Sequence, residues 1–102
     1  MMLALPAILM GAALAVADRM PDYDVRPSCH AATSLMSLDP KREARCLDDE
    51  ASARREVAAQ WAGFLPADRV RCAAEAQLDG TPSYVDLLEC LTLAREAKAT
   101  KD

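Results

Sequence analysis

The residues best able to do chemistry are four cysteines and one histidine, and two of these are adjacent as Cys29-His30 in the stretch RPSCHAA. Covalent haem attachment uses the motif C-x-x-C-H, in which two thiols bind the haem and the histidine ligates its iron. Arg26 stands where the first of those thiols would be. We therefore favour a structural role for Cys29 and keep a redox or haem-carrying protein that uses Cys29-His30 as an alternative.

The cysteines are spaced too widely for a metal centre or a thiol–disulfide oxidoreductase. Zinc and iron–sulfur sites usually draw on cysteines roughly two to four residues apart, and catalytic redox pairs form a C-x-x-C motif. Here at least sixteen residues lie between consecutive cysteines. We expect no metal and no cofactor, with His30 on the surface or half-buried in the first turn of a helix.

The sequence does not predict a hydrolase, although the potential nucleophiles Ser28 and Cys29 directly precede His30. Neighbours on a helix point about 100° apart, so they do not form a nucleophile and base that face one substrate. The chain has no nucleophile elbow, no H-E-x-x-H and no glycine-rich phosphate loop. The acidic run DDE at 48–50 is typical of a solvated helix face rather than a calcium loop. We expect a protein that is not an enzyme.

The elements that must position these residues are predicted to be helices separated by proline-marked turns, because no apolar run alternates as a strand requires. Ser28 is predicted to cap the first helix, and Asp39 with Pro40 to start the second. Gly80 is predicted to end the third in the left-handed conformation. The predicted fold class is all-α, a short bundle of four helices at about 29–36, 40–64, 67–78 and 82–97.

An even number of cysteines favours two disulfides in an oxidising compartment. Helices joined by a short turn bring together residues equidistant from that turn. Cys29 and Cys46 lie nine and eight residues from a turn in SLDP, and Cys72 and Cys90 lie eight and ten residues from Gly80. Pairing Cys46 with Cys72 would leave an axial mismatch of roughly 20 Å, whereas bonded cysteines have Cα atoms within about 7 Å. We predict Cys29–Cys46 and Cys72–Cys90, each clamping one helical hairpin.

Apolar residues at three- and four-residue steps predict the buried faces of the two longest helices. Glu50 and Arg54 are expected to pair on the solvent side of the second helix. Trp61, Phe64 and Tyr84 are expected to form core, and the alternative is that they form an exposed surface for a partner. The predicted buried faces comprise Leu47, Ala51, Val57, Ala58, Trp61, Phe64 and Leu65 on the second helix, and Tyr84, Leu87, Leu88, Leu91 and Ala94 on the fourth.

The first seventeen residues, MMLALPAILMGAALAVA, carry no charge and end in small residues. They resemble a secretory signal peptide, for which we expect cleavage after Ala17. A retained anchor is the alternative, and only in that case would the protein contact a membrane. Residues 18–27 are expected to be a flexible linker, 28–98 the helical disulfide domain and 99–102 a disordered tail.

The charge balance argues against nucleic acid as a partner. Twelve Lys and Arg residues face sixteen Asp and Glu residues, giving a net charge of -4. A phosphate-binding surface needs clustered basic side chains, whereas the basic residues here are interleaved with acidic ones. We expect a protein partner rather than a nucleic acid.

Five motifs, PSCHAA, CLDDE, QWAGF, ADRVRC and GTPSYVDLLECL, lie between Pro27 and about Leu93. Together they resemble a group of small exported, four-cysteine helical proteins of proteobacterial type whose function is unknown. The resemblance implies a secreted or periplasmic location and no assigned activity. Our interpretation is an exported, non-catalytic binding or accessory module whose protein partner is unknown; an enzyme inhibitor or secreted effector is a further alternative.

Overall fold

The computed structural model describes residues 19–34 and 39–101, so the predictions for residues 1–17 and for the turn in SLDP lie outside it. Within these ranges the chain is helical and contains no strand, as the sequence predicts. The elements are α2 (Arg26–Ser34), α3 (Pro40–Gln60), the 3₁₀ turn η1 (Trp61–Gly63), α4 (Pro66–Glu75) and α5 (Tyr84–Lys101).

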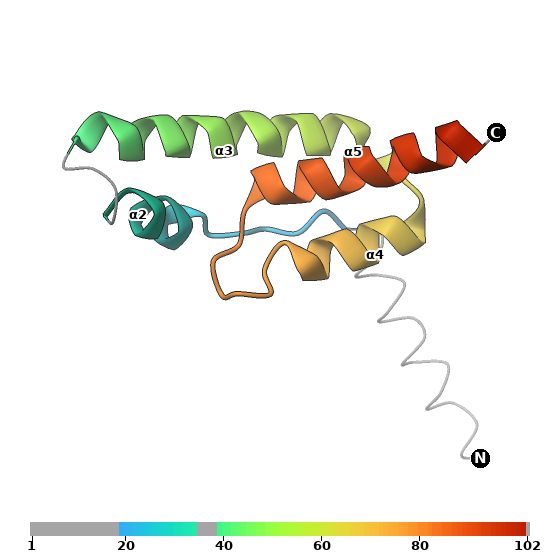
Figure 1. Cartoon of the computed structure of the whole chain (residues 1–102), viewed down its shortest axis with the longest axis horizontal. Helices are drawn as coiled ribbons and strands as arrows, with labels where there is room; N and C mark the ends of the chain where they lie inside the picture. The colour runs from blue at the N-terminus through green and yellow to red at the C-terminus, as the bar shows by residue number, and fades with distance from the viewer. Residues whose placement is uncertain (1–18, 35–38, 102) are drawn as a thin grey trace, which may run out of the picture.

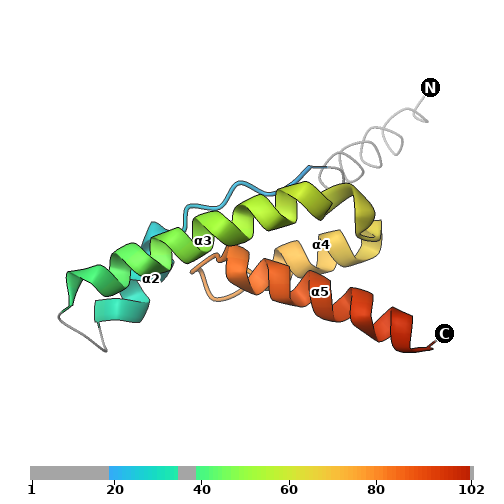
Figure 2. The ribbon, with the colours of Figure 1, turned by 90° about the horizontal axis from the view of Figure 1, so that it is seen from above.

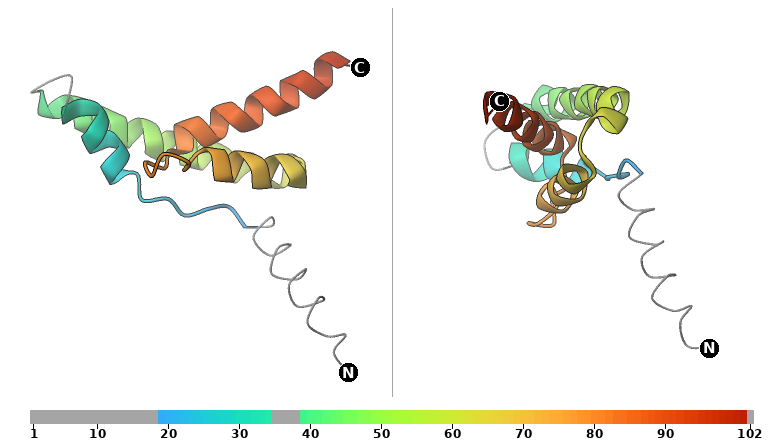
Figure 3. Two further views of the ribbon diagram at one scale, coloured as in Figure 1. Left: turned by 60° about the horizontal axis from the view of Figure 1, so that its bottom comes forward. Right: turned by 90° about the vertical axis from the view of Figure 1, so that its right-hand side faces the viewer.

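Helices α3, α4 and α5 surround one core, and α2 lies beneath the beginning of α3 (Figure 1). Seen from above, α3 and α5 lie beside each other (Figure 2), and α4 packs against α5. The end-on view shows the three helices around a common centre (Figure 3). This arrangement leaves one side of α5 turned away from both neighbouring helices.

Proline-marked helix starts are confirmed at the second and third helices. The Asp39 carboxylate accepts a hydrogen bond from the backbone N–H of Lys41 at 2.9 Å, and Pro40 occupies the first turn, where its missing N–H costs nothing. Pro66 likewise occupies the first turn of α4, although no side chain caps that helix. Gly80 has a φ of 80°, the left-handed conformation predicted for it.

The first helix begins at Arg26, three residues earlier than predicted, and Ser28 is not its cap. The carboxylate of Asp24 accepts from the backbone N–H of Arg26 at 3.2 Å and so satisfies the first free N–H group of the helix. The Ser28 hydroxyl instead donates to the carbonyl oxygen of Pro82 at 2.5 Å. Ser28 therefore ties α2 to the loop that precedes α5.

The last helix begins later and ends later than predicted. Its cap is Ser83, because the Ser83 hydroxyl accepts from the backbone N–H of Asp86 at 3.2 Å. The helix continues to Lys101, so residues 99–101, expected to belong to a disordered tail, are helical. Helix α4 ends at Glu75, and turn residues complete the stretch predicted to reach position 78.

The core forms where α3, α4 and α5 meet, but the buried face of α3 differs from the predicted one. Ala51, Ala58 and Leu65 are exposed, while Ala53 is buried. Alanines occur on several sides of α3, so its apolar spacing does not select one face. The larger side chains decide the face instead. The buried cluster consists of Ala53, Val57, Trp61, Phe64, Cys72, Ala76, Tyr84, Leu87 and Leu91.

Residues 19–25, which we call the strap, are extended and run along the side of the bundle between α3 and α4 (Figure 3). The Tyr23 hydroxyl donates to the carbonyl oxygen of Ala73 at 2.6 Å, and the Tyr23 N–H donates to the Tyr84 hydroxyl at 2.7 Å. The two tyrosine rings lie 5.0 Å apart. The expectation of a flexible linker at 18–27 is therefore wrong over the strap, because its aromatic side chain joins the core.

Candidate functional site

Both predicted disulfides are confirmed. Cys29 and Cys46 have Cα atoms 5.5 Å apart, and Cys72 and Cys90 have Cα atoms 5.6 Å apart. Cys29 and Cys72 are fully buried, and no cysteine is free. Each bond clamps one helical hairpin, α2 to α3 and α4 to α5, so the four thiols serve the architecture.

His30 lies on the surface of α2, with 74% of its side chain exposed. Its Nδ1 lies 3.4 Å from a carboxylate oxygen of Glu43 on α3. Because Cys29, next to it in sequence, is bonded to Cys46, Cys29-His30 does not form a thiol–imidazole pair. Among the described residues, no three His, Cys, Asp or Glu side chains are grouped so that they could hold a metal ion.

The aromatic residues considered as a partner surface are buried. Trp61 is 8% exposed, Phe64 4% and Tyr84 2%. The guanidinium of Arg95 covers the Phe64 ring at 4.8 Å, and that of Arg69 covers the Trp61 ring at 5.6 Å. The expectation that these aromatics form core is confirmed, and the alternative of an exposed partner surface is wrong.

Glu50, expected on the solvent side, is 4% exposed and holds the beginning of α5. Its carboxylate accepts from the Ser83 hydroxyl and from the backbone N–H of Tyr84, both at 2.6 Å. A carboxylate at a helix N-terminus also interacts favourably with the helix dipole. Arg54 does not pair with Glu50 and instead donates to the Tyr84 hydroxyl at 3.3 Å. A serine just before a helix is a cap signal that can be read from the sequence, but its hydrogen bond to Glu50, 33 residues away, cannot.

A hollow of about 320 Å³ lies where the strap meets α3. Its charged groups already have partners, because Arg54 bonds to the Tyr84 hydroxyl and lies 3.7 Å from a carboxylate oxygen of Asp22. Burial, and then the neighbouring Tyr84, raises the pKa of Tyr23 to about 12, so its hydroxyl is protonated at neutral pH. These groups hold the strap in place.

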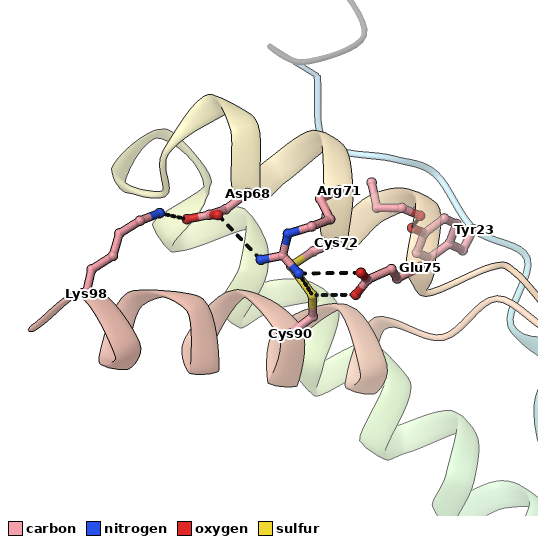
Figure 4. The surroundings of a disulfide bond; sticks show 8 residues. Tyr23, Asp68, Arg71, Cys72, Glu75, Cys90 and Lys98 are labelled. Carbon is pink, nitrogen blue, oxygen red and sulfur yellow. Dashed lines mark hydrogen bonds and ion pairs between the residues drawn. A yellow bond between two sulfur atoms is a disulfide. The ribbon is translucent and has the colours of Figure 1, made fainter. Parts of the chain in front are cut away.

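Charged side chains join α4 to α5 along the seam between them (Figure 4). Lys98 donates to the Asp68 carboxylate, and Arg71 lies 3.4 Å from carboxylate oxygens of both Asp68 and Glu75. The hydrogen bond from Lys98, assisted by Arg71, lowers the pKa of Asp68. The two carboxylates of the seam are thus balanced by two cations.

The Cys72–Cys90 disulfide lies within this charged seam (Figure 4). Arg71 Nη1 lies 3.8 Å from Cys90 Sγ, and a carboxylate oxygen of Glu75 lies 3.3 Å from the same sulfur. The second approach is a contact rather than a hydrogen bond, because a disulfide sulfur carries no proton. Charges of both signs therefore flank Cys90.

Two hollows along α5 share the residues Glu89 and Leu93. One, of about 540 Å³, lies toward α4 and is also lined by Arg71 and Glu75. The other, of about 400 Å³, is also lined by Leu88 and is mostly apolar. Leu93 lines both and is 64% exposed. This concave apolar surface is bordered by carboxylates.

Asp86, Glu89, Leu93 and Glu96, which we call the outer face of α5, follow one another at three- and four-residue steps. All four are exposed. Across residues 19–34 and 39–101, no ion pair engages the three carboxylates. Their spacing was visible in the sequence, but which face of a helix stays open depends on its neighbours. Sequence reasoning therefore missed this surface.

No protein-family model, curated protein or solved structure matches the chain. Nor does any helix in the described part of the chain have the length and apolarity needed to cross a membrane.

Proposed function

We propose that the protein is an exported, non-catalytic binding module that acts through the outer face of α5. Two disulfides support export because such bonds persist in the periplasm and outside the cell. The apolar first seventeen residues support it as well, because they resemble a signal peptide cleaved after Ala17. The proposed location is therefore periplasmic or secreted.

One observation carries the binding role: Leu93 is 64% exposed and lines two hollows. A single exposed leucine is ordinary on a protein surface. A leucine that borders a concave apolar surface is different, because a partner can bury both together. The outer face of α5 is therefore the surface we assign to binding.

The hydrogen bonds made by the buried carboxylate of Glu50 support a non-catalytic role. Glu50, the one buried carboxylate among the described residues, is engaged by Ser83 and by the backbone of Tyr84. A catalytic carboxylate instead needs a free oxygen within reach of a substrate proton. Glu50 acts as an architectural group.

Site-specific photocrosslinking in cells tests the proposal. A benzophenone amino acid replaces Leu93 in the full chain, and the matched control replaces Val70, which is 47% exposed on α4. We expect a discrete adduct with one protein from position 93 and none from position 70. Absence of an adduct from position 93, or the same adduct from both positions in equal yield, would overturn the proposal.

A further inference from the structure

We propose that the outer face of α5 receives a basic amphipathic helix, with lysine or arginine residues on both sides of an apolar anchor. This inference rests on the binding role proposed above and adds the chemistry of the partner. Three observations carry it: the unbalanced charge of the face, the apolar hollow beside Leu93 and the like charge that a second copy would bring.

The negative charge of this face is unbalanced within the described structure. Asp86, Glu89 and Glu96 are exposed and pair with no cation there, whereas the carboxylates of the neighbouring seam face Arg71 and Lys98. A partner that places cations opposite these three groups gains attraction and a faster encounter. The net charge of -4 adds to that attraction at longer range.

The apolar part of the face defines where the partner's anchor would lie. The hollow of about 400 Å³ is lined by Leu88 and Leu93 and bordered by Glu89. Glu89 and Glu96 lie one turn before and almost one turn after Leu93, so charge flanks the anchor on both sides. Helices dock in grooves through apolar residues at helical spacing, which matches this layout.

A second copy of this chain fits the face poorly. Pairing α5 with α5 through this face would bring like carboxylates together, which disfavours association. The two cations of α5 whose side chains the structure describes are turned elsewhere: Arg95 covers the Phe64 ring, and Lys98 binds Asp68. The same repulsion disfavours nucleic acid and anionic lipid at this surface.

Binding of three designed helical peptides to the full chain tests the inference. The first carries leucine and lysine at helical spacing, the second leucine and glutamate, and the third alanine and lysine. We expect the leucine–lysine peptide to bind most tightly and to shift the amide resonances of Glu89, Leu93 and Glu96. The double variant E89K/E96K should weaken its binding about tenfold at low salt. Leu93→Ala should weaken it without changing its salt dependence.

The double variant D49K/E56K is the matched control, because it makes the same charge change at exposed positions of α3. An equal loss of binding in both double variants would overturn the inference, since it would show attraction to net charge alone. Equal binding of the leucine–glutamate peptide, or formation of dimers through α5, would also overturn it. If no peptide binds while Leu93 still crosslinks to a partner in cells, the inference fails and the proposed function stands.

Discussion

Single residues decide how the strap, α3 and α5 are held together. The Tyr84 hydroxyl donates to the carbonyl oxygen of Pro21 at 2.9 Å and accepts from the strap backbone, while the backbone N–H of Tyr84 donates to Glu50. Glu50 therefore connects α3 to the first residue of α5. Buried polar groups paired in this way are costly to disrupt, because each lost partner leaves an unsatisfied group behind.

Replacement of Glu50 by alanine should destabilise the fold strongly. The Ser83 hydroxyl and the Tyr84 N–H would both lose their acceptor in a buried site, and we expect the free energy of unfolding to fall by about 3 kcal/mol. Urea unfolding followed by circular dichroism measures this change. Glu56→Ala is the control because Glu56 is exposed on the same helix, and it should change stability by less than about 0.5 kcal/mol. Equal effects would contradict the role assigned to Glu50.

Tyr23 should make the fold sensitive to alkaline pH. Its pKa is raised from 10.0 to about 12, so the folded state favours the protonated phenol. The stability this provides is complete below the unfolded pKa and is lost as pH rises from 10.0 through about 12. Unfolding free energies measured across this range should fall less steeply for Tyr23→Phe. An unchanged slope in the variant would contradict the burial of this hydroxyl.

At the scale of elements, the two disulfides hold parts of unequal importance. Cys72 belongs to the central core cluster, whereas Cys29 lies outside it. Helix α2 is attached by its disulfide and by the hydrogen bond from Ser28 to Pro82. Loss of the Cys29–Cys46 bond should therefore loosen α2, and loss of the Cys72–Cys90 bond should weaken the whole bundle.

Replacing each cysteine pair by serines tests this difference. The variant C72S/C90S should lower the free energy of unfolding by about 3 kcal/mol, the amount expected for a loop of this length. The variant C29S/C46S should speed amide exchange in α2 while the core of α3 and α5 stays protected. Equal loss of protection throughout the molecule in both variants would contradict the assignment.

The elements whose boundaries depend on local signals were predictable from the sequence. The turns are marked by the backbone preferences of Asp39-Pro40, Pro66 and Gly80. Both disulfides were predicted because each pair of cysteines lies at nearly equal distances from a turn. The buried face of α3 was not predictable, because its alanines supply apolar positions on several sides. The strap was missed because a short extended segment has no periodicity, and its order comes from tertiary contacts of Tyr23.

At the scale of the whole molecule, charge is sorted between a balanced seam and an unbalanced face. Asp68 and Glu75 are matched by cations where α4 meets α5, while the three carboxylates of the outer face of α5 form no ion pair with any described residue. This sorting could not be predicted from composition, since it depends on which side of α5 its neighbours cover. The open side of the last helix is therefore where we propose that a basic partner binds.

The binding role proposed for the outer face of α5 requires an exported chain whose four cysteines are architectural. A non-reducing peptide map of the protein isolated from its own cells tests this most directly. It should show a chain that begins at Asp18, recovered outside the cytoplasm, with Cys29 joined to Cys46, Cys72 joined to Cys90 and no free thiol. Recovery of a cytoplasmic chain that begins at Met1 with free thiols, or of Cys46 joined to Cys72, would contradict it.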